Sequence, residues 1–479
     1  MASTFGGINT ALTSLYAQRR GLDVTGQNIA NANTEGYTRQ RVRMQAQAGG
    51  LHPGIYATTD QVGSGVSVAG VERGRNEYLE ERGRTEHANS AYLSSQKATY
   101  GFIEDVFAEP GDTALQARLH DMWGAWNDVA NNWQDAATRS TLLERSRTVA
   151  LTLNEAYGSM SNQFDSLSGT LDTYVGQVNK LASSIAGMNQ QIVVAQGAGL
   201  QANELQDQRD REVMQLSELI GATTSRQPNG ALNVFVGNAP LVSEFTTRKL
   251  ELTGSPTLED VLPPSAVPAG LQWADTKTAA AAGGTMGAML DAMNTVIPDV
   301  VEQLNGVATT LIGKVNQIHE GDGSAEYPGG YTPAGVKGGP FFSGTSAADV
   351  AVAIGDVADV AFSKGDPAAP PPAVAALDHD IADQLADMGT SATGPDQTYQ
   401  ALVGQLGVAA QAALRRSDIQ DSVTDQVDTA RAGEAGVNLD EEMTHLLTYQ
   451  RGYEAASRVL TTIDSMLDQL INRTGLVGR

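Results

Sequence analysis

A long heptad pattern occupies the stretch that follows residue 150. Apolar residues recur there every seven positions, and a second, mostly apolar series lies at an offset of three. Six consecutive heptads of this kind are typical of a coiled-coil helix. We therefore predict a continuous helix from Leu153 to Ala195, about 65 Å long at 1.5 Å per residue. The first series, which forms the predicted shaft seam, consists of Tyr157, Phe164, Leu171, Val178, Ile185 and Ile192.

A second helix is predicted directly after the first. The segment GAGL at 197–200 suits a helix terminus, because glycine readily adopts the conformations that close a helix. The next segment, NELQDQRDREVMQLSELIG (203–221), places Val213, Leu216 and Ile220 where they can pack back onto the first helix. The pattern predicts an antiparallel helical hairpin that serves as a shaft.

Both ends of the chain carry narrower heptad stripes. Such a stripe needs one partner helix rather than a globular core, so we predict that the two ends pair with each other. An internal packing face would give the same pattern, but chain ends are usually weakly patterned, and this favours an assembly role. Asn438 can cap the C-terminal helix, with Glu441 three residues later. The predicted assembly seam comprises Ile8, Leu15, Leu22, Ile29, Leu439, Leu446, Tyr453, Leu460 and Leu467.

The segment QNIANANTEGYTRQRV (27–42) joins the first helix to the rest of the chain. Asparagine and glycine tolerate the left-handed backbone region, so we predict a helix end and a defined turn. After Gly36 the alternation of Arg39, Arg41 and Arg43 predicts a strand or extended arm. Its basic face is either a solvated edge strand or an arm that meets an acidic neighbour. The candidate junction residues are Asn28, Asn31, Asn33, Thr34, Gly36, Tyr37, Arg39 and Arg41.

Strand-like alternation is prominent in the segment 231–254. Leu232, Val234 and Val236 share one face, and a Gly-Asn turn follows them. This predicts a small antiparallel sheet. The expected fold is mainly α, with paired terminal helices, a long helical-hairpin or coiled-coil shaft, and a smaller antiparallel β portion inserted.

Composition and charge narrow the range of functions. The 479 residues include no cysteine, which excludes thiol catalysis, disulfides and cysteine-based zinc sites. The net charge of −24 argues against nucleic-acid binding. No apolar run approaches the ~18 residues that cross a bilayer, and the N-terminus lacks a cleavable-signal pattern. Residues 255–400 hold four basic and 18 acidic side chains among breaker-rich segments, so we expect them to be irregular and to face solvent.

Candidate catalytic chemistry is weak throughout the sequence. The six histidines show no HExxH spacing, and neither a GxSxG elbow nor a phosphate-binding loop is present. Asp378-His379-Asp380 is the best metal-like cluster, but three consecutive residues do not easily converge on one ion. Trp123, Trp126 and Trp133 have helical spacing that favours core packing. We expect no enzyme activity, no cofactor and no metal.

Several segments resemble the flagellar axial protein family, which comprises rod, hook and hook-associated proteins. QNIANANTEGYTRQRV resembles the family's N-terminal signature, and GYTRQRV is closer to the hook-associated members than to rod or hook protein. GVNLDEEMTHLLTYQRGYEAASRVLTTIDSMLDQLIN (436–472) is similar to the terminal helix of those members. NELQDQRDREVMQLSELIG, VNQIHEGDG (315–323) and GGPFF (338–342) resemble parts of their shaft. The acidic stretch 346–400 has no counterpart in this resemblance.

The resemblance implies a structural protein of the bacterial flagellum at the junction between hook and filament. It implies type III export without signal cleavage, an extracellular location, and terminal helices that are disordered before they form an inner tube. The implied partners are further copies in a ring, hook protein, hook-associated protein 3, and an export chaperone on the C-terminal helix, with no nucleic acid and no membrane. Another axial protein, such as hook or distal rod protein, is the first alternative. A secreted effector or enzyme with a site in the acidic middle is the second.

Three portions of the chain are expected from these patterns. They are an inner helical domain (1–45 with 435–479), a helical shaft (46–230 with 280–320 and 400–434), and a small β or irregular acidic outer portion (231–279 and 321–399).

Overall fold

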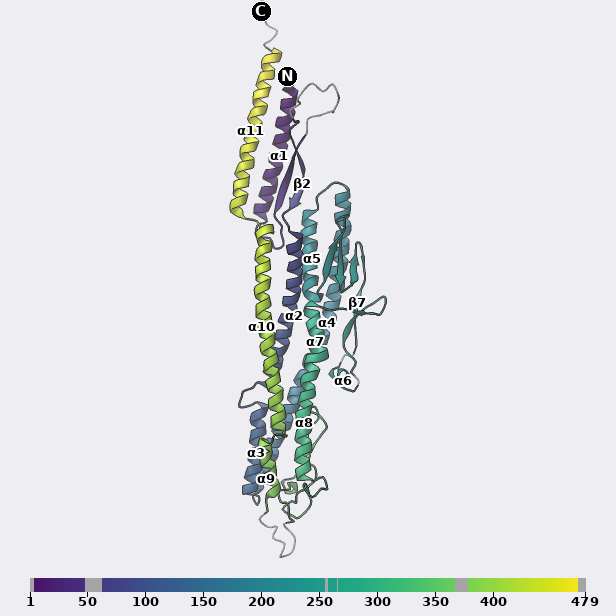
Figure 1. Cartoon of the computed structure of the whole chain (residues 1–479), viewed down its shortest axis with the longest axis vertical. Coiled ribbons are helices and arrows are strands. Elements are labelled where there is room, and N and C mark those ends of the chain that lie inside the picture. Colours follow the sequence, from purple (N-terminus) through teal and green to yellow (C-terminus); the bar gives the residue numbers. More distant parts are fainter. Residues whose placement is uncertain (1–3, 48–62, 255–256, 265, 367–377, 473–479) are drawn as a thin grey trace, which may run out of the picture.

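The chain forms an elongated, mainly helical molecule (Figure 1). The computed structural model describes residues 4–47, 63–254, 257–264, 266–366 and 378–472. The first and last helices lie side by side at one end, and the chain runs down through the shaft and returns to that end. The proline-rich stretch that starts at 367 lies outside the described residues.

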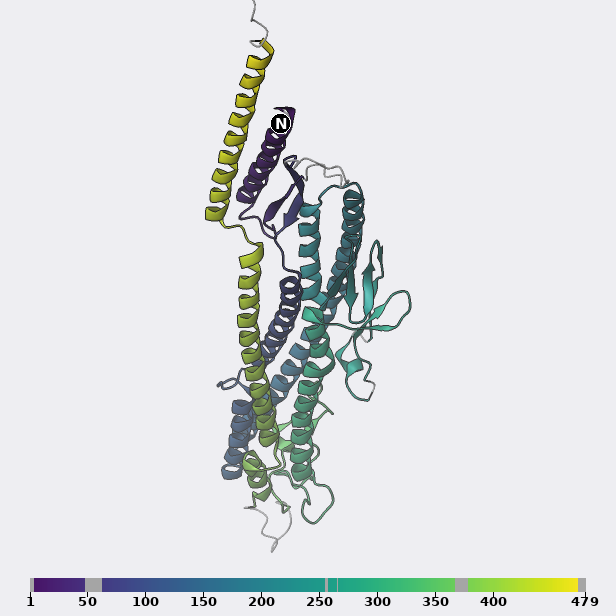
Figure 2. The ribbon, with the colours of Figure 1, turned by 45° about the horizontal axis from the view of Figure 1, so that its top comes forward.

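The terminal helices α1 (Thr4–Ala30) and α11 (Leu439–Asn472) pack against each other in an antiparallel pair (Figures 1 and 2). Small residues allow the close approach. A Cβ atom built on Gly21 would lie 2.7 Å from the Tyr449 ring, and one on Gly452 would lie 2.8 Å from Gln18. Asn438 Oδ1 accepts the Asp440 and Glu441 backbone N–H groups at 2.9 and 3.3 Å, which caps α11. The predicted pairing of the chain ends is confirmed.

A two-stranded ribbon lies beside α1. Strand β1 (Gln40–Ala46) pairs antiparallel with β2 (Val66–Arg73), with a bulge between Arg43 and Met44. Both strands contact α1. The predicted alternation begins in β1, but it does not put all three arginines on one face, because Arg39 precedes the strand and is buried. The ribbon also crosses residue 46, where the sequence placed a boundary between domains.

The predicted helical hairpin is present and longer than expected. Helix α4 (Ala136–Gly197) spans 62 residues, and α5 (Asn203–Ile220) returns along it and ends at Gly221 in the left-handed conformation, with φ 71°. The sequence placed the start of α4 at Leu153. The earlier turns were missed because Arg139 and Ser146, both buried, occupy heptad positions where apolar residues were required.

The shaft seam of α4 is a core stripe shared by many elements. Five of its six residues, from Phe164 to Ile192, are fully buried, and Tyr157 is half-buried with its hydroxyl donating to Glu259. Helix α4 contacts α5, α3 (Leu115–Asn131), several strands and α8 (Ile297–His319). The heptads therefore mark the inner face of a bundle, and not the seam of a two-stranded coiled coil.

The remaining long helices complete the shaft. Helices α2 (Glu77–Phe107) and α10 (Pro395–Ala435) run antiparallel along each other. Helix α7 (Gly284–Asp291) continues through a π-helical turn (Ala292–Val296) into α8. Trp123 and Trp126 are buried as expected, while Trp133 is half-buried and stacks on Phe362.

Two small antiparallel sheets pack against the C-terminal half of α4. The predicted hairpin is formed by two strands of the first sheet, β4 and β5, with its turn at Gly237-Asn238. Asn189 and Asn179 of α4 bind the backbones at Leu232 and Leu250 through their amides. The first sheet contains β3 (Thr223–Arg226), β4 (Leu232–Val236), β5 (Ala239–Ser243) and β6 (Thr246–Thr247), and the second contains β7 (Leu250–Thr253), β8 (Gly270–Trp273) and β9 (Ala279–Ala280).

Short elements cover the other half of α4. Asn154 donates to the Ala347 carbonyl at 2.8 Å, and Arg139 donates to the Val357 carbonyl at 2.9 Å. The two segments predicted as one outer portion therefore sit on successive stretches of α4. The short elements that contact α4 are α6 (Leu258–Val261), β11 (Ala351–Val352) and a 3₁₀ turn (Val357–Asp359). Strand β10 (Phe342–Ser343) pairs with β11, and α9 (Asp380–Ala386) and a second 3₁₀ turn (Asp387–Thr390) contact α3.

His319, at the end of α8, holds this region together as a buried neutral side chain. The Ala361 N–H donates to Nε2 at 2.9 Å, so Nδ1 must carry the proton that it donates to the Gly339 carbonyl at 2.7 Å. The rings of Trp126 and Phe341 lie against it. Burial lowers the pKa of His319 to about 4, although the Gly339 hydrogen bond acts in the opposite direction.

We expect acidification to destabilise the shaft through His319. The folded pKa of about 4 lies below the usual value of 6.5, so the unfolded chain takes up a proton first. The contribution of His319 to the free energy of unfolding is complete above pH 6.5 and falls as the pH drops toward 4. The total loss is about 3 kcal/mol. Denaturant titrations between pH 7 and pH 4 should show a steeper loss for the wild type than for His319→Gln. Parallel pH profiles for the two proteins would contradict this account.

Candidate functional site

The connection between the terminal helices and the shaft contains many polar contacts between elements. It brings together residues 28–40, 71–80, 203–211 and 428–442, which we call the joint. The chain passes from one part to the other between β2 and α2 and again between α10 and α11. The joint therefore controls how the terminal pair is held on the shaft.

Asn28 closes the turn that follows α1. Its side-chain oxygen accepts the Gln40 N–H and the Tyr37 hydroxyl, each at 2.9 Å. Its amide nitrogen donates to the Gln40 carbonyl at 2.9 Å and to Glu442 at 3.0 Å. All of these contacts are made by a side chain that is buried. Asn28 thus fixes the start of β1 and touches the first turn of α11 as well.

Arg39 joins the same turn to α11 through a buried ion pair. Its Nε lies 2.7 Å from Glu442 Oε1, and both side chains are nearly inaccessible, at 6% and 3%. Its Nη1 contacts the more exposed Glu441 at 2.7 Å, and its backbone N–H donates to the Ala435 carbonyl at 2.9 Å. Burial alone would lower the pKa of Arg39, but the two carboxylates outweigh it and raise the pKa. Of the two alternatives for the basic arm, Arg39 therefore meets an acidic neighbour within its own chain, whereas Arg41 and Arg43 are exposed as on a solvated edge strand.

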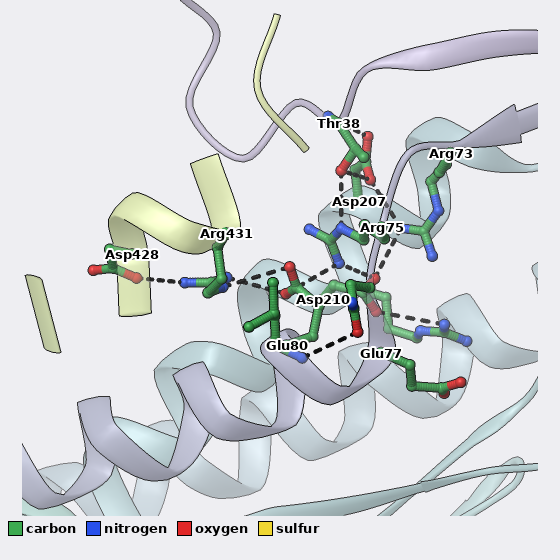
Figure 3. A network of polar contacts seen from close by, with 12 residues as sticks. Thr38, Arg73, Arg75, Glu77, Glu80, Asp207, Asp210, Asp428 and Arg431 are labelled. Atoms are coloured by element: carbon green, nitrogen blue, oxygen red, sulfur yellow. Dashed lines mark hydrogen bonds and ion pairs between the residues drawn. The ribbon is translucent and has the colours of Figure 1, made fainter. Parts of the chain in front are cut away.

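A second set of ion pairs ties β2 to α5 (Figure 3). Asp207 accepts the Thr38 N–H at 3.1 Å and the Thr38 hydroxyl at 2.8 Å. Arg73 Nη1 lies 2.8 Å from both Asp207 and Asp210. Arg75 binds Asp210 and donates from Nε to the Thr38 hydroxyl at 2.9 Å. Thr38, which follows the turn, is therefore bonded to α5 of the shaft and to Arg75, which follows β2.

The chain of contacts continues to α2 and α10. Arg75 lies 3.7 Å from Glu80, Glu80 lies 3.0 Å from Arg431, and Arg431 lies 2.8 Å from Asp428. Figure 3 shows these groups pointing toward one another from separate elements. We call the whole set the joint network; it consists of Thr38, Arg73, Arg75, Glu80, Asp207, Asp210, Asp428 and Arg431.

Asp210 is the central anion of the joint network. Burial alone would raise its pKa, but Arg73, Arg75 and Arg209 together hold the pKa below the usual 3.8. The pKa of Arg73 is raised in turn, because Asp210 and Asp207 outweigh its burial. Asp210 therefore stays charged down to acidic pH and compensates three partly or fully buried arginines.

The structure brings together part of the predicted junction motif. Asn28, Tyr37 and Arg39 lie in the joint, and burial raises the pKa of Tyr37 to about 12, with Glu204, Asp207 and Glu442 adding to it. Gly36 has φ 73° and packs on Arg211.

The other members of the motif have local or exposed positions. Thr34 donates to Asn31 at 3.2 Å within the turn, while Asn33 and Arg41 are exposed.

The predicted assembly seam is only partly enclosed. Ile8, Leu15, Leu22 and Ile29 of α1 are half-buried, as are Leu446, Leu460 and Leu467 of α11. Leu439 and Tyr453 are 49% and 41% exposed. The closest contacts come instead from the neighbouring row, which includes Tyr449, Ala456 and Ile463. Several more apolar side chains of α11 are exposed, namely Met443, Leu447, Val459, Met466, Leu470 and Ile471.

The candidate metal cluster is used for local capping. Asp378 accepts the backbone N–H groups of Gly365 and Asp380, and His379 contacts Asp383. Among the described residues, no group of three or more histidine and carboxylate side chains is placed to hold a metal ion. The helices of that same part of the chain include none long and apolar enough to span a membrane.

Comparison with known proteins identifies the family. Residues 100–342, just over half of the chain, match the model of the flagellar hook-associated protein FlgK helical domain. The chain belongs to the FlgK family. Residues 434–473 match the C-terminal model of the flagellar basal body rod FlgEFG proteins, and residues 8–38 match the flagella basal body rod protein model. These two matches cover the segments that form the terminal pair.

Individual relatives agree with the assignment. The chain is 29% identical to flagellar hook-associated protein 1 of Bacillus subtilis, over the full length of both. It is 28% identical to the Escherichia coli protein of that name, over 51% of this chain and 44% of the relative. The fold is similar to the flagellar hook junction protein FlgK from Burkholderia pseudomallei, with TM-score 0.60 and 16% identity over 73% of this chain and 99% of that one.

Membership of the FlgK family confirms the resemblance seen in the sequence. It makes the chain a structural hook–filament junction protein of the flagellum, and not an enzyme. The alternative of a secreted enzyme with a site in the acidic middle is therefore wrong.

Proposed function

We propose that the chain assembles as a ring of identical copies at the hook–filament junction, with its terminal pair facing inward. The exposed apolar side chains of α11, which include Met443, Leu447 and Val459, carry this proposal. One partner helix, α1, covers only part of the apolar surface of α11. The apolar surface of α11 that α1 leaves uncovered does not stabilise a monomer, whereas packing among neighbouring copies would bury it.

The proposed partners follow from this arrangement. Further copies contact the assembly seam, hook protein lies on one side of the ring, and hook-associated protein 3 lies on the other. An export chaperone is the expected partner of α11 before assembly, because it would cover the same exposed apolar side chains. Export by the type III pathway, with ordering of the terminal helices on docking, suits a chain without cysteine.

The proposed domain division keeps 1–45 with 435–479 as the inner portion and adds β2 to it. The contacts of β2 with β1 and α1 support this addition. The shaft then begins with α2, and the sheets and short elements on α4 form the outer surface. The joint sets the angle between the inner and outer portions.

Labelled electron microscopy tests this proposal. Val336 is 62% exposed, so a tag can be inserted beside it. Gold label on this tag should mark a single narrow band at the distal end of each hook. Label along whole hooks would indicate a hook protein, and label at the hook base would indicate a rod protein; either would overturn the proposal.

A further inference from the structure

His87 of α2 lies between two carboxylates that belong to two other helices. Its Nδ1 lies 3.1 Å from Glu218 Oε1 of α5, and its Nε2 lies 2.9 Å from Asp428 Oδ2 of α10. A neutral imidazole has one N–H and can donate to only one of them, whereas an imidazolium donates to both. The geometry on both sides therefore suits the charged form of His87.

The charged groups around His87 come from three helices. Glu218 faces it from α5, and Asp428 faces it from α10. Arg431, also on α10, binds the other oxygen of Asp428 at 2.8 Å and reaches Glu80 of α2. The hydrogen bond with Glu218 raises the pKa of His87, partial burial opposes this, and Asp428 adds to the increase.

Uncharged side chains surround the remaining space. A cavity of about 450 Å³ beside His87 is lined by Ser90, Gln177 of α4, Gln215 and Thr285 of α7, together with Glu218. The His87 side chain is 25% exposed, so protons from solvent can reach it. Among the described residues that line this cavity, no lysine or arginine competes for the two carboxylates from this side.

We propose that His87 is a proton-dependent staple that joins α2 to both α5 and α10. When charged, it holds both carboxylates. When it loses its proton, one ring nitrogen presents a lone pair to a carboxylate, and that contact becomes repulsive. A folded pKa above the unfolded value means that the staple stabilises the shaft fully below about pH 6.5 and is lost as the pH rises through the folded pKa.

Release of the staple extends to the joint network through Asp428. This carboxylate holds His87 with one oxygen and Arg431 with the other, and Arg431 binds Glu80 in turn. Proton binding at His87 is therefore coupled to the Arg431–Glu80 contact, which joins α10 to α2 within the joint network. The sign is opposite to that of His319, which weakens the shaft when the pH falls.

Nitrogen NMR on ring-¹⁵N-histidine protein tests the staple in the intact chain. Below the pKa of His87 both of its ring nitrogens should have the shifts of protonated nitrogens, and that pKa should exceed 6.5. Asp428→Asn and Glu218→Gln should each lower that pKa. The exposed His120 is the internal control, and His87→Gln assigns the signal, or the other five His→Gln variants do so by elimination. A His87 pKa at or below 6.5 in the wild type overturns the proposal.

Amide hydrogen exchange measures how the His87 contacts affect the stability of α10. After correction for intrinsic rates, residues 420–431 of α10 should be more protected in the wild type than in His87→Gln at pH 6, and the difference should shrink at pH 9. His120→Gln should match the wild type at both pH values. Equal protection in His87→Gln and the wild type at pH 6 would contradict the coupling to α10.

Discussion

Cells that produce Glu442→Ala in place of the wild-type chain are expected to lose most of their filaments while keeping their hooks. The substitution leaves Arg39 buried, with only the more exposed Glu441 beside it, and removes one of the two acceptors of the Asn28 amide. Breaking a buried ion pair by removing one partner costs about 3–5 kcal/mol, because an uncompensated charge remains inside. That is enough to prevent α11 from ordering against α1. The measurement is the fraction of hooks that carry a filament in negative-stain images.

Glu441→Ala is the matched control for this prediction. It removes the other carboxylate bonded to Arg39, but the Glu441 side chain is 57% exposed. Pairs with an exposed partner contribute only about 0–1 kcal/mol, so filament attachment should stay close to the wild-type level. Equal losses in the two variants would show that the buried pair is not what positions α11.

Asp210→Asn is expected to destabilise the purified chain by about 3–5 kcal/mol, because it removes a buried carboxylate that compensates several buried cations. The side chain keeps its size but loses the charge that Arg73, Arg75 and Arg209 share. Denaturant unfolding at pH 7 measures the loss. Because the pKa of Asp210 lies below 3.8, this contribution is present above the unfolded pKa and is lost as the pH falls through the lower folded value.

The control for Asp210→Asn is Glu77→Gln in the same region. Glu77 pairs with Arg226 at 2.8 Å, but the two side chains are 68% and 41% exposed. Its removal should change the free energy of unfolding by no more than about 0.5 kcal/mol. A loss as large as that of Asp210→Asn would mean that the joint network gains its strength from total charge and not from burial.

The elements that could be predicted are those with a regular period. Phe164 and Leu171 mark α4 because a 3.5-residue repeat has few other interpretations, and Leu232 and Val234 mark β4 because alternation fixes a strand face. Asn438 was recognised as a cap because capping is local. The start of α4 was missed because Arg139 is buried through a carbonyl contact with a segment more than 200 residues away.

The joint network could be predicted only in part. Asn28 and Arg39 belong to a recognisable motif, but their partner Glu442 lies about 400 residues later. Asp207 and Asp210 occur in a charged run on an amphipathic helix, which on its own indicates a solvated face. The one available signal was the acidic cluster at the start of α11, which could have been matched to the basic arm under the second of its two interpretations. Tertiary packing determines which carboxylate pairs with which arginine, and this pairing produces no periodic pattern in the sequence.

The most direct test of the account is a negative-stain image of cells whose chain lacks residues 440–479. If this structural protein joins filament to hook through its paired terminal helices, these cells should have hooks of normal length without filaments. The full-length chain should restore the filaments. Hooks that still carry attached filaments in the truncated strain would contradict the account.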